Sequence, residues 1–260
     1  MIKIAAFDVD HTLYTLEGIN PTAVEAIHKL QDNKILFVVA TGRCAYALDM
    51  ISDAKLEYDY LVGASGAIVS DKQGNIIAIN TLSKETVENL TKDAETNEFE
   101  LVFKFKDASY IYNKYEQTME YLKFMQNVYQ FTFNGEDHTR HLKDLPLGAV
   151  IHGDAKLIEE IASKYEDLDF LPFAEGRYDI VQKGIGKDWG LKQLCNYLNL
   201  DATNIIAFGD NYNDITMLKY VGIGIAMGNG EHCVKAIADD ICDSADNDGI
   251  AKALERYKLI

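Results

Sequence analysis

Short apolar runs recur along this chain, and most of them end abruptly at polar residues. Runs of this length, bounded by turn-forming residues, are typical of strands buried on both faces of a sheet. Amphipathic stretches separate them, as at 20–30, where Asn20 and Pro21 suit the N-cap and first turn of a helix. The alternation predicts a parallel sheet with right-handed helical crossovers. The predicted buried strands are 4–7, 35–40, 60–64, 205–208 and 222–227, and the expected helices are 45–53, 187–198, 215–220 and 249–257.

The pattern changes in the middle of the chain. Residues 67–82 are typical of a hairpin, and from 83 to 183 helices alternate with half-buried antiparallel strands. The sequence therefore predicts an α/β protein: a Rossmann-like parallel-sheet core of residues 1–82 and 184–260, interrupted by an α+β domain at 83–183. Within this insertion we expect a helix capped by Ser83, strands at 100–112 and 148–152, helices at 115–127 and 155–165, irregular chain at 134–146, and a strand pair over 170–181 that turns at Glu175 and Gly176.

Composition limits the partners and the compartment. The formal net charge of the 260 residues is −16, which argues against nucleic acid or an anionic membrane as a main partner but allows a small phosphorylated substrate. No apolar run approaches the length of a membrane-spanning helix, and Asp8 and Asp10 come too early for a signal peptide. The four cysteines show no metal-ligand spacing, which favours reduced thiols in a cytoplasmic protein. The oligomeric state stays open.

Candidate chemistry gathers where three predicted strands end. In a parallel sheet the carboxyl ends of the strands meet at one edge, so these side chains are expected to lie close together. Carboxylates there repel unless they share a cation, and Mg2+ prefers oxygen ligands. Hydroxyl and backbone N–H groups suit phosphate oxygens, and Lys187 at a helix start is the best-placed cation for a phosphate. The three groups are Asp8, Asp10 and Thr12; Thr41 and Gly42; and Asp210, Asn213 and Asp214.

Each of these segments also has a simpler interpretation. The first aspartates could be solvated residues of a turn, Thr41 and Gly42 could only cap a helix, and Lys187 could be a solvated helix residue. The run from Gly209 to Asp214 could be a plain turn or a calcium loop, although it lacks the acid spacing of an EF-hand.

The motifs and their order resemble those of the haloacid dehalogenase-like hydrolases. The insertion at 83–183 resembles the larger cap domain of the Cof-type phosphatases in this family. The resemblance rests on Asp8-Val9-Asp10-His11-Thr12, Thr41-Gly42-Arg43, Lys187 and Gly209-Asp210-Asn211-Tyr212-Asn213-Asp214, with Asp179 to Lys187 and Asp246 to Ala251 similar to the return from the cap and to the closing segment. It covers nearly the whole chain.

This resemblance implies a role for each matching residue. Asp8 would attack phosphorus and form an aspartyl-phosphate, and Asp10 would protonate the leaving alcohol and then help to activate water. Mg2+ would be held by Asp8, by Asp10 through its backbone carbonyl, and by Asp210, with Asp214 supporting the ion through water. The implied phosphate-binding residues are Thr12, Thr41, Gly42, Lys187 and Asn213.

Two departures from the family pattern bear on the substrate. His11 stands where the family usually has glycine, and Ser65-Gly66-Ala67 stands where it commonly has Asn-Gly-Ala. His11 has either a structural role or a role in tuning the substrate and proton traffic. The other candidate specificity residues are Arg43, Glu175, Arg177, Tyr178 and Asp179, of which the last four could equally belong to a hairpin with a solvated turn.

The leading functional hypothesis is a Mg2+-dependent phosphatase that acts on a small phosphorylated metabolite, such as a sugar phosphate or a phosphorylated cofactor. A phosphomutase would use the same chemistry. A non-catalytic switch phosphorylated on Asp8, or a ligand-binding protein that lost catalysis, are the alternatives from other classes.

Overall fold

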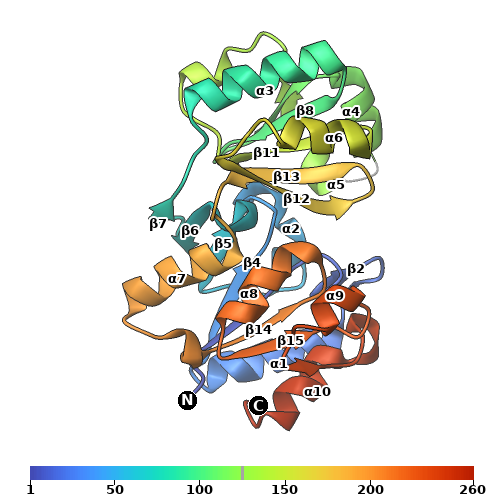
Figure 1. The fold of residues 1–260 in the computed structure, drawn as a ribbon. Helices are drawn as coiled ribbons and strands as arrows, with labels where there is room; N and C mark the ends of the chain where they lie inside the picture. The colour runs from blue at the N-terminus through green and yellow to red at the C-terminus, as the bar shows by residue number, and fades with distance from the viewer. Residues whose placement is uncertain (124–125) are drawn as a thin grey trace. The chain divides into compact units, whose positions relative to one another are not determined.

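The computed structural model describes residues 1–123 and 126–260, which form two compact units. The first unit comprises Met1–Gly42, Asp49–Ala78 and Gly186–Ile260, and the second comprises Arg43–Leu48 and Ile79–Ile185. Each unit has its own sheet and its own apolar core (Figure 1). The domain boundaries expected from the sequence, and the role of 83–183 as a substrate-selecting cap, stay predictions.

The first unit is built on an eight-stranded sheet in the order β16-β15-β14-β1-β4-β5-β6-β7. The pairs from β16 to β5 are parallel and β6 runs antiparallel to β5, as the apolar runs and the predicted hairpin indicated. The strands are β1 (Ile4–Phe7), β4 (Leu36–Ala40), β5 (Tyr60–Gly63), β6 (Ile68–Asp71), β7 (Ile76–Ile79), β14 (Ile205–Gly209), β15 (Ile223–Ala226) and β16 (Asp240–Ile241).

Helices cover both faces of this sheet. On one face Ile4 and Ala6 pack with Leu191 and Leu194 of α7 (Lys187–Leu198). Side chains alternate along a strand, so Phe7 points to the opposite face, where its ring stacks on that of Phe208 with centroids 4.9 Å apart. Figure 1 shows α7 and α8 in front of the sheet and α1 behind it. The other helices of the unit are α1 (Pro21–Asp32), α2 (Asp49–Asp53), α8 (Ile215–Tyr220), α9 (His232–Lys235) and α10 (Gly249–Arg256).

The second unit has a six-stranded sheet in the order β10-β9-β8-β11-β13-β12. Its core contains Phe99, Phe103 and Tyr112, packed against Leu90 of α3 and Ile158 of α6. The elements are α3 (Lys84–Asn97), β8 (Glu100–Lys104), β9 (Ser109–Asn113), α4 (Tyr115–Leu122), α5 (Gln126–Tyr129), β10 (Thr132–Asn134), β11 (Gly148–His152), α6 (Ala155–Ala162), β12 (Leu168–Ala174) and β13 (Arg177–Gln182).

One expectation for the second unit is wrong. Residues 100–112 form a hairpin of β8 and β9 and not a single strand, because the chain reverses where the backbone N–H of Phe105 donates to the carbonyl of Ala108. Both arms carry the same alternating aromatic pattern, so periodicity alone does not reveal the reversal. The helix expected over 115–127 includes 124–125, which lie outside the described residues.

Very short elements also escaped the sequence pattern. The hairpin of β2 (Tyr14–Thr15) and β3 (Gly18–Ile19), together with β16, α9 and β10, are too short to carry a hydrophobic period. The helix expected over 45–53 is two pieces, a 3-10 turn at Ala45–Ala47 followed by α2. No helix in the described part of the chain has the length and apolar character needed to cross a membrane.

Packing of α7 on the sheet generates a prediction about stability. Leu191 is fully buried in this interface, so Leu191→Ala should lower the free energy of unfolding by about 2–5 kcal/mol through lost burial and a cavity. Denaturant-induced unfolding measures the change. Leu16→Ala is the matched control, because Leu16 is fully exposed and its truncation should stay within about 0.5 kcal/mol. Similar losses in the two variants would contradict this account of the core.

Candidate active site

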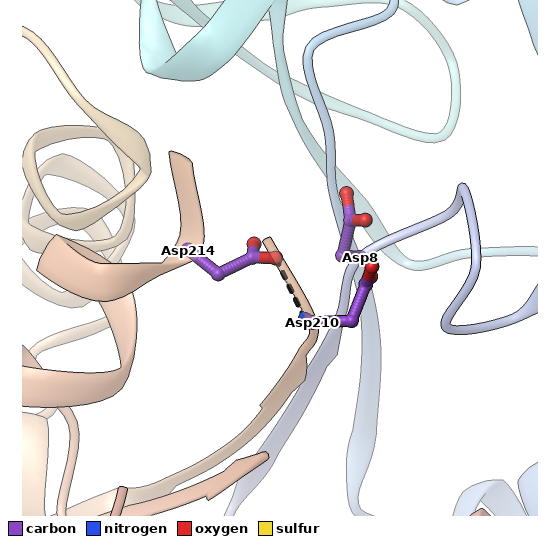
Figure 2. A group of neighbouring side chains, drawn as sticks. All are labelled: Asp8, Asp210 and Asp214. Atoms are coloured by element: carbon purple, nitrogen blue, oxygen red, sulfur yellow. Dashed lines mark hydrogen bonds between the residues drawn. The ribbon is translucent and has the colours of Figure 1, made fainter. Parts of the chain in front are cut away.

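Two strands place the central carboxylates side by side. Asp8 follows β1 and Asp210 follows β14, and these parallel strands pair in register, with Phe7 opposite Phe208. Asp214, from the turn before α8, joins them, and one carboxylate oxygen of each residue lies within 4.8 Å of the others. Figure 2 shows Asp8 and Asp210 at adjacent strand ends with Asp214 approaching from the side. All three are buried, Asp214 completely.

Lys187 is the cation within this acidic group. It is the first residue of α7 and fully buried, and its Nζ donates to Asp8 Oδ1 and to Asp214 Oδ1, each at 2.6 Å. The second oxygen of Asp214 accepts the backbone N–H groups of Asp210 and Asn211, at 2.9 and 3.0 Å. Asp214 therefore uses both oxygens to hold Lys187 and the loop after β14.

Asp8 and Asp210 each keep one carboxylate oxygen for a ligand. Asp210 Oδ1 accepts the Thr12 hydroxyl at 2.8 Å, and Asp8 Oδ1 accepts Lys187. Their second oxygens make no hydrogen bond to the described residues. The group can thus bind an electrophile or a cation without breaking its internal contacts.

Burial and like charge dominate the electrostatics. Burial raises the pKa of Asp8 well above its usual value; Lys187 opposes the rise, and Asp214, Asp210 and Asp10 add to it. Burial, with Asp214, also raises the pKa of Asp210 to about 6. For Lys187, burial alone would lower the pKa, but Asp214 and Asp8 outweigh it and the net shift is upward. One lysine does not balance this many carboxylates, so the site favours an added cation.

The donor set fits a hard divalent ion. Mg2+ binds carboxylate and carbonyl oxygens and keeps several waters, and this buried group supplies such oxygens. Nearby, Asn213 Oδ1 is buried and has no hydrogen-bond partner among the described residues, which is costly unless a ligand or water donates to it. The residues therefore fit Mg2+, although the identity of the ion stays a prediction.

Two glycines let the backbones approach closely enough to build the site. A Cβ on Gly209 would lie 2.5 Å from Asp214 Cγ, so only glycine leaves room for this carboxylate beneath the end of β14. Gly66 has a φ of +100°, and its Cβ would lie 2.0 Å from the carbonyl oxygen of Gly186, just before Lys187. Sequence analysis did not identify Gly66 as a positioning residue, because its partner is distant in the chain.

The remaining core candidates lie at the same sheet edge or in the loop after β1. Thr41 directly follows β4, the strand next to β1, and is buried; its N–H donates to the Val62 carbonyl and its own carbonyl accepts the N–H of Ser65. Gly42 follows it and is half-buried. Asp10 is half-buried and forms a backbone bridge with Tyr14. The roles of Asp10, Thr41 and Gly42 in acid–base chemistry and phosphate binding stay predictions.

His11 adopts the backbone conformation that glycine would favour. Its φ is +60°, in the left-handed region. Its N–H donates to the Tyr14 carbonyl, and its own carbonyl accepts Asn229 Nδ2 at 2.7 Å. Asn229 also accepts the N–H of Ala245, so it ties the loop after β1 to two others. Sequence analysis missed Asn229, whose only signal is its position after a strand.

The candidate specificity residues of the second unit are held by different contacts. Asp179 forms a buried ion pair with Lys104 at 2.6 Å, a partner that sequence analysis missed. The Arg177 guanidinium lies over the Tyr121 ring, 3.6 Å from its centroid, and Tyr178 packs against the core. Arg43 Nη1 donates to the carbonyl of Ala47, at 3.3 Å, and Glu175 is exposed at the β12–β13 turn. Their roles in substrate selection stay predictions.

A comparison with known families defines the class of protein. The model of the haloacid dehalogenase-like hydrolases matches residues 5–254, and the chain belongs to this family, in its Cof-type subfamily. Its parallel core sheet and separate inserted sheet are those of the family's fold. The protein is therefore a phosphoric monoester hydrolase of this family.

Individual relatives align over almost the full chain. It is 27% identical to a 5-amino-6-(5-phospho-D-ribitylamino)uracil phosphatase of Bacillus subtilis over 99% of this chain and 96% of the relative. It is 28% identical to a phosphoglycolate phosphatase of Methanobrevibacter smithii over 99% of both chains. A phosphatase structure from Bacteroides thetaiotaomicron superposes with a TM-score of 0.91 at 26% identity, covering 100% of this chain and 96% of that one.

The raised pKa of Asp210 predicts that replacing this carboxylate by a neutral side chain stabilises the fold at high pH. A carboxyl whose pKa rises to about 6 on folding stabilises the fold below a pH of about 4 and loses that contribution as the pH rises through about 6. In the metal-free protein, Asp210→Asn should therefore raise the free energy of unfolding at pH 8, by on the order of 2 kcal/mol, and change it little near pH 4. Unfolding in the presence of a chelator at both pH values measures this.

The control for this experiment is Glu25→Gln, which neutralises an exposed carboxylate on α1 and should change stability little at either pH. A loss of stability in Asp210→Asn at pH 8 without metal would contradict the electrostatic description of the site.

Proposed function

We propose that the protein is a Mg2+-dependent phosphatase that hydrolyses a small phosphorylated metabolite through an aspartyl-phosphate on Asp8. The observation that carries the proposal is the buried Asp8 carboxylate, held at one oxygen by Lys187 with its other oxygen available at the sheet edge. A carboxylate fixed in this way is oriented for attack on phosphorus, and the adjacent ammonium can neutralise charge on the transferring group.

The proposed reaction has two steps. In the first, Asp8 attacks phosphorus, the ester P–O bond breaks, and Asp10 gives its proton to the leaving alkoxide. In the second, Asp10 takes a proton from water, which attacks phosphorus and releases Asp8 and inorganic phosphate. Asp8, Asp210 and the backbone carbonyl of Asp10 would hold Mg2+, and Asp214 would support the ion through water. When bound, the ion would stabilise negative charge on the phosphoryl oxygens.

The proposed phosphate contacts come from several segments. Thr12, Thr41, Gly42, Lys187 and Asn213 would surround the phosphoryl group. The buried, unpartnered Oδ1 of Asn213 supports a ligand at this position, since a buried amide oxygen normally accepts a hydrogen bond. The Thr12 hydroxyl already donates its hydrogen to Asp210. Toward the substrate it would therefore either accept a hydrogen bond from a protonated phosphate oxygen or contribute by orienting the Asp210 carboxylate.

The substrate class that we propose is a sugar phosphate or a phosphorylated cofactor or its precursor. Two relatives are named for phosphatases of small phosphomonoesters, a phosphoribitylamino-uracil and phosphoglycolate, which supports this class. The net charge of −16 supports a small partner over nucleic acid or an anionic membrane. We propose a cytoplasmic location, in keeping with the free thiols of the cysteines.

The decisive experiment measures phosphate release from a panel of small phosphomonoesters with Mg2+. Asp8→Asn should lower kcat by at least about a thousandfold on every substrate that wild type hydrolyses, because the amide is a poor nucleophile. The asparagine Oδ1 can still accept Lys187, so the thermal unfolding midpoint should confirm an intact fold. Glu25→Gln serves as the surface control. Undiminished release by Asp8→Asn would disprove the nucleophile assignment, and turnover without free phosphate would favour a phosphomutase.

A second prediction concerns His11. Burial dominates the raised pKa of Asp210, and His11 is among the charges that oppose the rise, so its imidazole lies within electrostatic reach of this carboxylate. We expect His11→Gly to change kcat/KM and the pH–rate profile while keeping the fold, since glycine adopts a φ of +60° without strain. Unchanged kcat/KM and an unchanged pH profile would show that the imidazole has only a structural role.

A further inference from the structure

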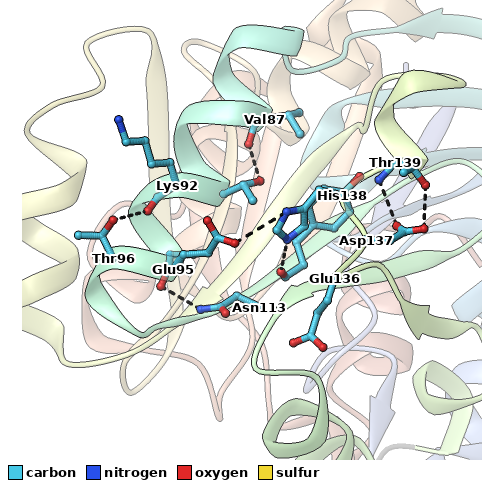
Figure 3. A network of polar contacts seen from close by, with 12 residues as sticks. Val87, Lys92, Glu95, Thr96, Asn113, Glu136, Asp137, His138 and Thr139 are labelled. Atoms are coloured by element: carbon cyan, nitrogen blue, oxygen red, sulfur yellow. Dashed lines mark hydrogen bonds and ion pairs between the residues drawn. The ribbon is translucent and has the colours of Figure 1, made fainter.

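The second unit contains a polar cavity that the proposed phosphatase chemistry does not use. It has a volume of about 410 Å³ and lies between α3 and the loop that contains His138 and His141. Helix α3 contributes Glu88, Lys92 and Glu95, which recur every three or four residues and so share one face of the helix. Figure 3 shows Glu95 and His138 facing one another across this space.

A single buried residue, Tyr112, holds both imidazoles. Its backbone carbonyl contacts His138 Nε2 at 2.9 Å, and its hydroxyl contacts His141 Nδ1 at 3.0 Å. The rings of Tyr112 and His138 also stack, with centroids 5.3 Å apart. Because a carbonyl only accepts, His138 Nε2 must donate, and in the neutral ring its Nδ1 carries the lone pair.

The remaining ring nitrogens are available to a ligand. His138 Nδ1 lies 3.9 Å from Glu95 Oε1, too far for a hydrogen bond. His141 is only 7% exposed and lines the cavity, and its Nε2 has no hydrogen-bond partner among the described residues. The Tyr112 hydroxyl has two acceptor sites, so it can accept both the backbone N–H and the Nδ1–H of His141, which leaves the Nε2 lone pair for a ligand.

These features match the preferences of a transition-metal ion. Metal-binding histidines usually donate their other ring N–H to a fixed acceptor, and Tyr112 provides one for each ring. Ligands about 2.1 Å from a tetrahedral ion lie about 3.4 Å apart, close to the separation of His138 and Glu95. Glu88 and Glu95 are offset by Lys92 and by Lys84, which pairs with Glu88, so the preference for a cation rests on the available ring nitrogens and on the net charge of −16.

We propose that this cavity binds a first-row transition-metal dication, such as Zn2+, through His138 Nδ1, His141 Nε2 and the carboxylate of Glu95. In the described chain only Asp8, Asp210 and Asp214 bring three ligand atoms within 4.8 Å. Since His138 and Glu95 are already 3.9 Å apart, closure requires that the distance from this pair to His141 becomes shorter through side-chain rotation. Glu95 is 56% exposed and can rotate. Glu88, which also lines the cavity and ion-pairs with Lys84 at 3.6 Å, can supply a fourth ligand, and water is the alternative.

Calorimetric titration of Zn2+ into the full chain, with saturating Mg2+ present, tests the proposal. Wild type should bind one Zn2+ with an affinity that falls at least tenfold in His138→Gln and in Glu95→Gln. Tyr112→Phe should weaken binding by about 10–100-fold, because it removes the partner that orients His141. The matched control is His28→Gln, which changes an exposed histidine of α1 and should leave Zn2+ affinity unchanged.

A parallel titration of Asp210→Asn separates this site from the active site. Retention of Zn2+ binding in Asp210→Asn, together with its loss in His138→Gln, would support the proposal. Equal affinity in wild type and His138→Gln, or loss of binding only in Asp210→Asn, would overturn it. The readout is heat of binding, so failure of the phosphatase assignment would not alter it.

Discussion

The buried contact of Lys187 with Asp8 and Asp214 is the constraint on which the active site depends. Removing an ammonium and two carboxylates from water costs several kcal/mol per ion, and a buried ion pair often returns less than apolar residues would. The negative charge of the carboxylates also exceeds the positive charge of Lys187. Burial and the neighbouring carboxylates therefore raise the pKa values of Asp8 and Asp210. This arrangement lowers stability, and the chemistry that we propose accounts for its presence: Asp8 would be held as the nucleophile, and the remaining charge would be neutralised by a cation.

The sheet supplies the rigidity that such a site needs. Asp8 and Asp210 follow β1 and β14, whose residues are buried, so packing on both faces of the sheet fixes the strands that carry these carboxylates. Lys187 begins α7, which packs on the same sheet. At Gly66 and Gly209 the neighbouring atoms come so close that an added Cβ would lie only 2.0 and 2.5 Å from them, so any side chain would block the approach. The geometry of the candidate site is thus a product of strand register and close backbone packing.

The second unit combines an aromatic-rich core with buried polar contacts. Lys104 and Asp179 pair within its sheet, and Tyr112 orients two histidines at the edge of its core. Buried polar contacts of this kind hold their groups in one geometry, because an unpaired polar group in a low dielectric is costly. The phosphatase assignment for the first unit and the metal proposal for the second therefore rest on separate sets of contacts.

The sequence by itself determined much of this protein. Apolar runs ending at Asp8, Thr41 and Asp210 predicted the parallel sheet and the edge at which Asp8 and Asp210 meet, because the burial of strands and the ends of parallel strands can be predicted from local sequence. The order of the motifs indicated the family. Tertiary structure alone decided that Asp214 uses both its oxygens internally, that 100–112 reverses into a hairpin, and that Lys104 finds Asp179. These outcomes depend on contacts between residues far apart in the chain, and no local pattern of hydrophobicity or charge encodes which distant partner a side chain meets.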